Sequence, residues 1–143
     1  MKSFLLKDKK PIVKWGSLKD NIFFEGQIPD GYSLAVCPSK GIVILDVDKH
    51  DGKDGFNNIP AFILKELNKT LNYKTKNDGR HFWLKYTGEK ELANKASSKS
   101  IDLRTHKGYA VWYEKKDIRS CENLINETSL KLNQWLEKLF SYV

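Results

Sequence analysis

Short apolar runs alternate with polar turns along most of this chain, and the runs are rich in β-branched and aromatic side chains. Runs of this length, bounded by glycine, proline, asparagine or aspartate, are typical of β-strands. We expect strands over residues 32–36, 42–48, 81–86, 100–104 and 109–113, and a short strand or extended piece over 73–75. Turns are expected over 77–79 and over 105–108, where the second turn joins the last two strands.

Two segments instead carry the spacing of amphipathic helices. Over 59–70, apolar residues recur at i, i+3 and i+4, and Pro60 suits the first turn of a helix. The mostly apolar face of this segment consists of Ile59, Phe62, Ile63, Glu66 and Leu67. Near the C-terminus, Thr128 or Ser129 is a candidate N-cap for a final helix. The apolar stripe of that helix consists of Leu132, Trp135, Leu136, Leu139 and Phe140.

The remaining segments predict little regular structure. No element is expected before residue 32, and polar loops are expected over 50–58 and 89–100, the second with at most one helical turn. Strands and helices in this order favour an antiparallel-rich sheet with a few helices, which is an α+β fold. With 143 residues, 40% of them hydrophobic, the chain is long enough for one domain with its own core, and we assign residues 1–143 to it.

Charge and cysteine content narrow the classes of function. The formal net charge is +7, and a basic chain is attracted to nucleic acid or to other acidic surfaces. Cys37 and Cys121 are too few for a disulfide scaffold and form no CxxC zinc motif. The apolar stretch over 4–6 is too short for a signal peptide or a membrane span. We therefore expect a protein of the reducing cytoplasm, with no membrane partner.

Two carboxylates mark the end of an apolar run. Asp46 and Asp48 follow residues 41–45, which read as a buried strand. Because side chains alternate along a strand, both acids point to the same face, about 6–7 Å apart. Two neighbouring carboxylates repel each other, and oxygen ligands favour Mg²⁺ or Mn²⁺. The pattern therefore predicts metal-dependent chemistry, and the basic charge balance suggests a polyanionic substrate.

A calcium loop and a solvated strand end are the alternatives for these two acids. An EF-hand loop that began at Asp46 would need glycine at its sixth position and glutamate at its twelfth. The chain has Asp51 and Asn57 there, so that pattern fails. A solvated strand end stays open, because most acids are exposed.

Residues near the other strands likewise allow either a functional or a structural role. Taken alone, His81 is more simply a core histidine whose hydrogen bonds are satisfied. Asp102 and Arg104 fit a same-face surface ion pair that contributes little to stability. Two roles stay open for three of the tryptophans, stacking on nucleic-acid bases and burial in the core. They are Trp15, Trp83 and Trp112.

The order of four short motifs resembles a known family. They are residues 44–48 (ILDVD), 75–83 (TKNDGRHFW), 101–104 (IDLR) and 107–111 (KGYAV). This set resembles the Prim-Pol domain of the archaeo-eukaryotic primase superfamily, in which Asp-x-Asp, Gly-x-His, an Asp-containing strand and a Gly-Tyr strand follow in this order. The N-terminal Lys9-Lys10-Pro11 and Trp15 also resemble the opening motif of the family. The resemblance covers about residues 9–113.

The resemblance implies a fold and a role for individual residues. The implied fold is a small archaeo-eukaryotic primase-like fold, with an RRM-like antiparallel sheet, a second α/β layer and the active site in the cleft between them. The catalytic residues, which also hold two Mg²⁺ or Mn²⁺ ions, would be Asp46, Asp48 and Asp102. The residues that bind the nucleotide phosphates would be His81, Arg80 and Arg104, with Gly79 leaving room for close approach of the backbone.

The implied activity is template-dependent joining of nucleotides on single-stranded DNA, by a primase or polymerase. Its partners would be a single-stranded DNA template, nucleoside triphosphates and a separate helicase or other replisome protein. A compact, stand-alone form suggests replication of a phage or another mobile element. Two alternatives stay open: a single-strand or origin-binding replisome module without synthesis, and a metal-dependent nuclease, because the same acids can activate water.

Overall fold

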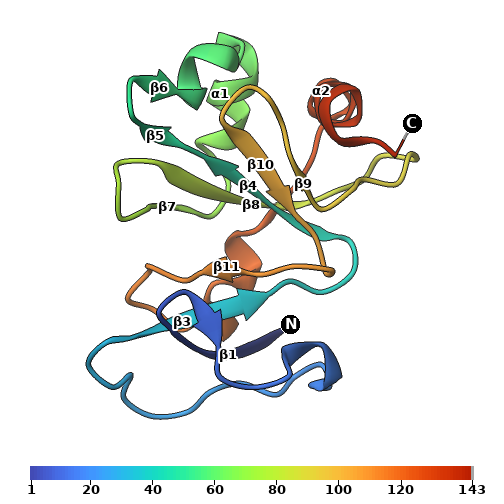
Figure 1. Ribbon diagram of the computed structural model, residues 1–143. Coiled ribbons are helices and arrows are strands. Elements are labelled where there is room, and N and C mark those ends of the chain that lie inside the picture. The colour runs from blue at the N-terminus through green and yellow to red at the C-terminus, as the bar shows by residue number, and fades with distance from the viewer. Residues whose placement is uncertain (143) are drawn as a thin grey trace.

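Two main β-sheets and two α-helices lie in layers in the computed structural model, which describes residues 1–142 (Figure 1). The lower sheet in this view is antiparallel, with the strand order β11 (Ala110–Val111), β3 (Tyr32–Cys37), β1 (Lys2–Lys7) and β2 (Lys10–Pro11). The upper, six-stranded sheet has the order β12 (Asn126–Glu127), β8 (Arg80–Lys85), β4 (Ile42–Val47), β10 (Ile101–Arg104) and β9 (Lys95–Ala96). Its sixth strand, β7 (Asn72–Lys74), pairs with β8. Only the β12–β8 pair of this sheet is parallel.

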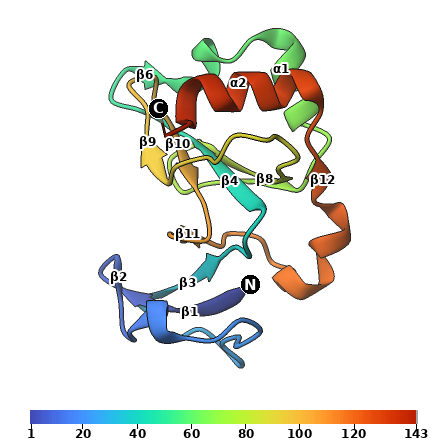
Figure 2. The same cartoon turned by 90° about the vertical axis from the view of Figure 1, so that its right-hand side faces the viewer.

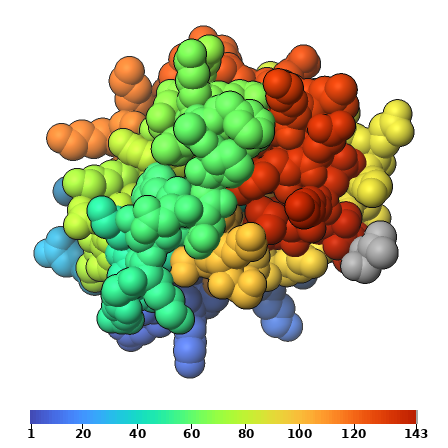
Figure 3. Space-filling model, turned by 90° about the horizontal axis from the view of Figure 1, so that it is seen from above, coloured from blue at the N-terminus to red at the C-terminus, as the bar shows by residue number. Residues whose placement is uncertain are grey.

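The helices α1 (Ala61–Leu67) and α2 (Leu130–Phe140) cover the face of the six-stranded sheet that points away from the lower sheet (Figure 2). Seen from that side, the green segment around α1 and the red α2 lie next to each other (Figure 3). Smaller elements of residues 1–142 are the hairpin β5 (Lys49–His50) and β6 (Lys53–Asp54) and the 3₁₀ helices Trp15–Ser17, Gly55–Asn58, Ile118–Ser120 and Glu122–Leu124. None of the described helices has the length and apolar character needed to cross a membrane.

Alternation along β4 separates the two faces of the upper sheet. Val43, Leu45 and Val47 are buried in the core beneath the helices. Ile44, one residue out of phase, lies in a second core between the two sheets. Asp46 follows Ile44 by two positions and therefore shares its face. The sheet consequently carries its acids on the side of the four-stranded sheet and leaves the helix side apolar.

The chain passes between the two sheets three times, from β3 to β4, from β10 to β11 and from β11 to β12 (Figure 1). The turn predicted over 105–108 joins its two strands as expected, but these strands belong to different sheets. The Thr105 carbonyl accepts a hydrogen bond from the Gly108 N–H (3.0 Å), and the Thr105 N–H donates to Asn94 Oδ1 (2.9 Å). These passages bring the four-stranded sheet against the acid-bearing face.

Most of the predicted strands are confirmed within one or two residues, namely β3, β4, β7, β8 and β10. The strand predicted over 109–113 is much shorter, Ala110–Val111. The final helix is confirmed as well: Ser129 Oγ accepts from the Leu132 N–H (3.2 Å) as its N-cap, and Leu132, Leu136 and Phe140 are buried. The mixed architecture agrees with the α+β prediction.

Strand β1, in the interior of the four-stranded sheet, is not predicted by the sequence pattern. Its residues 2–6 are buried, although Lys2 and Ser3 interrupt the apolar pattern. Lys2 Nζ donates to the Leu18 carbonyl (2.8 Å), and Ser3 Oγ accepts from the Phe24 N–H (2.8 Å). Because the following loop supplies these partners, polar side chains are tolerated in a buried strand, where an alternation pattern does not reveal them.

The first helix is shorter than predicted. Pro60 lies at its N-cap, and the helix spans Ala61–Leu67 instead of 59–70. Ile63 and Leu67 are buried, but Phe62, expected on the same face, is 59% exposed. Beyond Leu67 the chain turns toward β8, where Thr70 Oγ1 donates to the Trp83 carbonyl (2.6 Å). This contact with the sheet competes with further helical turns.

Two predicted loops contain more structure than expected. The segment 50–58 includes part of the β5–β6 hairpin and the 3₁₀ helix Gly55–Asn58, which Asp54 caps by accepting from the Phe56 N–H (2.9 Å). The segment 89–100 has no helical turn; it holds β9, which pairs with β10. Ser97 Oγ donates to the Ile101 carbonyl (2.6 Å) and closes the turn between these strands.

Candidate metal and nucleotide site

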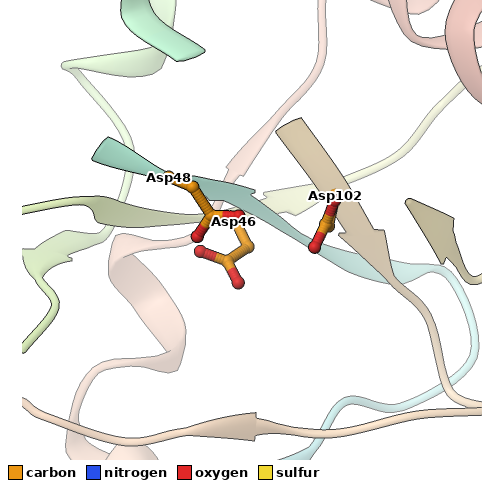
Figure 4. A group of neighbouring side chains, drawn as sticks. All are labelled: Asp46, Asp48 and Asp102. Carbon is orange, nitrogen blue, oxygen red and sulfur yellow. The ribbon is translucent and has the colours of Figure 1, made fainter. Parts of the chain in front are cut away.

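Strand register brings the predicted acids together. β4 lies between β8 and β10, and Asp46 is the direct partner of His81 on one side and of Asp102 on the other. The three residues therefore form a row across the sheet, on the face turned toward the four-stranded sheet. Asp48, two residues beyond Asp46, extends the row along the direction of β4. The carboxyl groups of the three aspartates point to the same side of the sheet (Figure 4).

The geometry of this triad fits a hard divalent cation. Asp46, Asp48 and Asp102 each offer a carboxylate oxygen, and these atoms lie within 4.8 Å of one another. Two ligands of one Mg²⁺ at about 2.1 Å lie at most about 4.2 Å apart, so small side-chain rotations are sufficient to bind it. All three side chains are half-buried. A purely carboxylate ligand set of this kind favours Mg²⁺ or Mn²⁺ over softer metals.

The protein raises the pKa of two of these acids. Burial raises the pKa of Asp48, and the neighbouring charges of Asp46 and Asp102 raise it further. Burial also raises the pKa of Asp102, against the opposing effect of the Arg104 guanidinium. Desolvation and like charges both disfavour the ionised carboxylates. The ionised triad is therefore costly by itself and would be relieved by a cation.

The imidazole of His81 belongs to this arrangement. Its Nε2 lies 3.3 Å from Asp46 Oδ1, and its Nδ1 lies 3.1 Å from the hydroxyl oxygen of Tyr73. The residue is 5% exposed, yet it lines the pocket described below. The histidine is thus buried with both nitrogens in contact, as the structural role expected from the sequence requires, and it faces the acids. Its functional role, binding of the nucleotide phosphates, stays a prediction.

The predicted basic residues divide between the two faces. Arg104 Nη2 lies 3.5 Å from Asp102 Oδ2, and Arg104 lines the pocket. Arg80 pairs with Val47, whose side chain is in the core beneath the helices. Alternation therefore turns Arg80 to the face opposite His81, and it does not line the pocket. The sequence pattern predicts a strand that begins at His81, so Arg80 is not expected to alternate with it, whereas β8 begins at Arg80.

Position 79 has room only for glycine, because the backbone of β4 and the Thr75 side chain lie against it. A Cβ at this position would collide with the Val47 carbonyl oxygen and come within 2.9 Å of Thr75 Oγ1. The predicted turn over 77–79 is present, and Asp78 adopts the left-handed conformation (φ 64°). The Asp78 carboxylate lies 3.1 Å from Lys74 Nζ, and Asp78 does not line the pocket. The turn thus presses the backbone of Gly79 against β4, beside the acids.

A pocket of about 640 Å³ lies between the two sheets, next to the triad. Asp46, Asp48 and His81 line its wall on the upper sheet. The opposite wall consists of residues from the four-stranded sheet and its loops, including Leu6, Trp15, Tyr109 and Val111. Trp15 therefore faces the pocket, whereas Trp83 and Trp112 are buried in the core between the sheets. The volume is typical of a small-molecule site.

Basic side chains around the pocket were not singled out in the sequence. They are Lys9, Lys49, Lys76 and Lys107. All four directly follow or lie within a motif: Lys9 begins the opening motif, Lys49 follows Asp48, Lys76 follows Thr75 and Lys107 precedes Gly108. Their position next to the motifs was the signal that could have found them. With Arg104 they outnumber the two aspartates of the lining, so the pocket suits a polyanion.

Two tyrosines near the acids were also missed. The Tyr113 ring centroid lies 6.1 Å from that of His81, and burial together with the Asp46 charge raises the Tyr113 pKa. Tyr73 contacts His81 directly. Tyrosine is common in cores, so neither position carried a signal in the sequence.

Comparison with known proteins bears on the whole arrangement. A search of curated protein sequences found no match to the chain. The family described as bifunctional DNA primase/polymerase, N-terminal (Prim-Pol) matches residues 6–116. The matched range contains all three acids and His81, and it points to an enzyme of the DNA primase/polymerase type, which is metal-dependent and acts on DNA and nucleotides. Because the match covers most of the chain and confirms the resemblance, the chain belongs to the Prim-Pol family.

Proposed function

We propose that this protein is a small nucleotidyltransferase that joins nucleotides on a single-stranded DNA template, as a primase or a primer-extending polymerase. The observation that carries the proposal is the triad Asp46, Asp48 and Asp102, which converges beside a basic pocket inside the range matched by the family. Acids from two strands and lysines from separate loops serve no shared structural purpose here. They do suit a triphosphate and the cations that accompany it.

The acids would hold two divalent cations, Mg²⁺ or Mn²⁺. When bound, these ions activate the attacking 3′-hydroxyl and neutralise charge on the triphosphate. Asp46 and Asp102, direct partners on neighbouring strands, and Asp48, two residues beyond Asp46, would together hold these ions. The raised pKa values of Asp48 and Asp102 mean that protons compete with the cations at acidic pH.

The basic and polar groups of the pocket would orient the nucleotide. We propose that His81 and Arg104 contact its phosphates, with Lys49 and Lys76 at the mouth on the same side. Arg104 offers a planar, permanently charged donor, which suits phosphate oxygens. Lys9 and Lys107 lie on the side of the four-stranded sheet, where they would contact the template backbone. Arg80, on the opposite face, takes no part in this arrangement.

A primer-synthesis assay tests the proposal. Purified protein is incubated with single-stranded DNA, labelled nucleotides and Mn²⁺ or Mg²⁺, and products are sized. Wild type should lengthen or begin strands, whereas Asp46→Asn and Asp48→Asn should abolish incorporation. Asp30→Asn, which removes an exposed acid outside the pocket, is the matched control and should retain activity. Shortened strands would indicate a nuclease instead, and DNA binding without metal-dependent products would indicate a replisome module.

The biological setting stays a prediction. Replication of a phage or another mobile element and a separate helicase or replisome partner follow from the family resemblance. The cytoplasmic location and the assignment of residues 1–143 to one domain follow from composition and length, and they stay predictions as well.

A further inference from the structure

The hydroxyl group of Tyr73 lies at the centre of a buried hydrogen-bond cluster behind the acids. It donates to the Val111 carbonyl, accepts from Trp83 Nε1–H and contacts His81 Nδ1, each at 3.1 Å. Tyr73 is 6% exposed. The cluster joins three strands, because Tyr73 comes from β7, Trp83 and His81 from β8 and Val111 from β11. It thus connects both sheets at the back of the pocket.

The donor and acceptor inventory decides how His81 is held. A phenol has one hydrogen and two lone pairs. The hydrogen goes to Val111, whose carbonyl can only accept, and one lone pair takes the indole N–H of Trp83, which can only donate. His81 Nδ1 takes the remaining position around the hydroxyl oxygen, at 3.1 Å. Each polar group of the cluster therefore has a partner.

The same bond fixes where the other ring nitrogen points. With Nδ1 held by Tyr73, Nε2 faces Asp46 Oδ1 at 3.3 Å. A flipped imidazole would place carbon atoms at both polar contacts. Tyr73 itself is held rigidly: its ring packs edge-on against Trp112, with centroids 5.0 Å apart, and it is the cross-strand partner of His81. The partner at one nitrogen of an imidazole sets the tautomer and the orientation available at the other.

We propose that Tyr73 is a positioning residue, whose hydroxyl holds the imidazole of His81 so that Nε2 faces Asp46 and the pocket. The effect of Tyr73 on nucleotide binding rests on the proposed function, in which His81 Nε2 would contact a phosphate oxygen. The effect of Tyr73 on the orientation of the His81 ring is independent of the proposed function. Tyr73 lies two residues before the Thr75 that opens the nearest motif, and no motif of the chain includes it.

The test begins with Tyr73→Phe, which keeps the buried ring and removes only the hydroxyl. In metal-free protein, nitrogen-resolved NMR of the imidazoles should show a hydrogen bond at Nδ1 of His81 in wild type and a shifted His81 Nδ1 signal in the variant. The variant should bind a nucleoside triphosphate with Mn²⁺ about tenfold more weakly, as expected for one lost hydrogen bond at the site. Affinity for single-stranded DNA should be unchanged. Tyr86→Phe, which removes a phenol hydroxyl that contacts Lys90 and Glu137 outside the pocket, is the matched control and should change neither measurement.

A double-mutant cycle separates positioning from general damage to the core. In a His81→Ala background, Tyr73→Phe should cause no further loss of nucleotide affinity, because the residue it positions is gone. Additive losses, an equal loss in Tyr86→Phe, or an unchanged His81 signal would each overturn the proposal. Absence of a hydrogen bond at His81 Nδ1 in wild type would overturn it even if the variant failed to fold. A separate outcome is that wild type binds no nucleotide while its His81 Nδ1 signal still shifts in Tyr73→Phe. That result would refute the proposed function and leave the positioning of His81 by Tyr73 intact.

Discussion

Asp46 of β4 and Asp102 of β10 face each other as direct partners on neighbouring antiparallel strands. Like charges directly opposite one another destabilise a sheet. Each of these side chains is only 19% exposed, so solvent screens the repulsion poorly. Arg104 near Asp102 compensates part of one charge, and His81 Nε2 lies 3.3 Å from Asp46 Oδ1. The pair therefore lowers the stability of the fold, and a bound cation is the simplest reason for placing it there.

The charges of Asp46 and Asp102 also repel the Asp48 carboxylate, so Asp48→Asn should stabilise the metal-free protein. The Asp48 carboxyl has a raised pKa, so the folded chain binds its proton more tightly than the unfolded chain. Stability is then lost as the pH rises from the unfolded to the folded pKa, and the full penalty holds above the folded pKa. In chelator at about pH 7.5 the variant should melt a few degrees higher than wild type, since each kcal/mol shifts the Tm of such a chain by about 3–5 °C.

The pH dependence of this gain in Tm tests whether the ionised Asp48 carboxylate is its cause. The difference in Tm between Asp48→Asn and wild type should vanish below the ordinary aspartate pKa of about 3.9, where both states of wild type are protonated. Asp30→Asn should show no gain at either pH, because Asp30 is exposed. A gain that persisted in acid would refute carboxylate repulsion as its source.

Divalent cations should stabilise the wild type through the same acids. A ligand that binds only the folded state at 100 times its Kd adds about 2.7 kcal/mol. Addition of Mn²⁺ should therefore raise the Tm of wild type by several degrees, and the rise should be much smaller in Asp46→Asn and Asp102→Asn. The shift should also shrink as the pH falls into the range where these carboxylates take up protons, which begins higher than for ordinary aspartates because the pKa values of Asp48 and Asp102 are raised. Equal shifts in wild type and both variants would place the cation elsewhere.

The acids of the candidate site were predictable from the sequence because strand alternation is a local property. Asp46 and Asp48 share a face in any strand, and the structure bears this out. Their contact with Asp102 depends on which strands are neighbours, which the sequence pattern alone does not determine. It came only from the family resemblance.

What the sequence could not reveal depends on pairing between distant segments. The burial of β1 relies on partners in the loop after Trp15, and the presence of Tyr73 behind His81 relies on the register of β7 against β8. Arg80 is a different case, because strand alternation is local. The predicted strand begins at His81, whereas β8 begins at Arg80, so the two neighbouring side chains point to opposite faces.

Gly79→Ala should destabilise the protein by packing alone. A methyl group there meets the carbonyl oxygen of Val47, which is held in the centre of the sheet and cannot move aside cheaply. Inserting a group into a packed site costs roughly 1–3 kcal/mol, which chemical denaturation would measure. Gly16→Ala is the matched control, because no atom lies within 4 Å of its added Cβ and its φ is not positive. Equal effects of the two substitutions would show that Gly79 is not tightly packed.

Affinity for single-stranded DNA should fall steeply with salt. Each phosphate contact releases counterions, with a slope of about −0.7 per contact for single strands, so a few contacts lower the affinity at least tenfold between about 50 and about 200 mM salt. Lys9→Ala and Lys107→Ala, at the pocket, should each reduce the slope by about 0.7. Lys131→Ala, whose ammonium lies over Phe62 on the helix face, should leave it unchanged. Duplex DNA should bind more weakly, because its bases are not accessible for pairing. A preference for duplex, or a slope that responds equally to all three substitutions, would argue against a template path through this pocket.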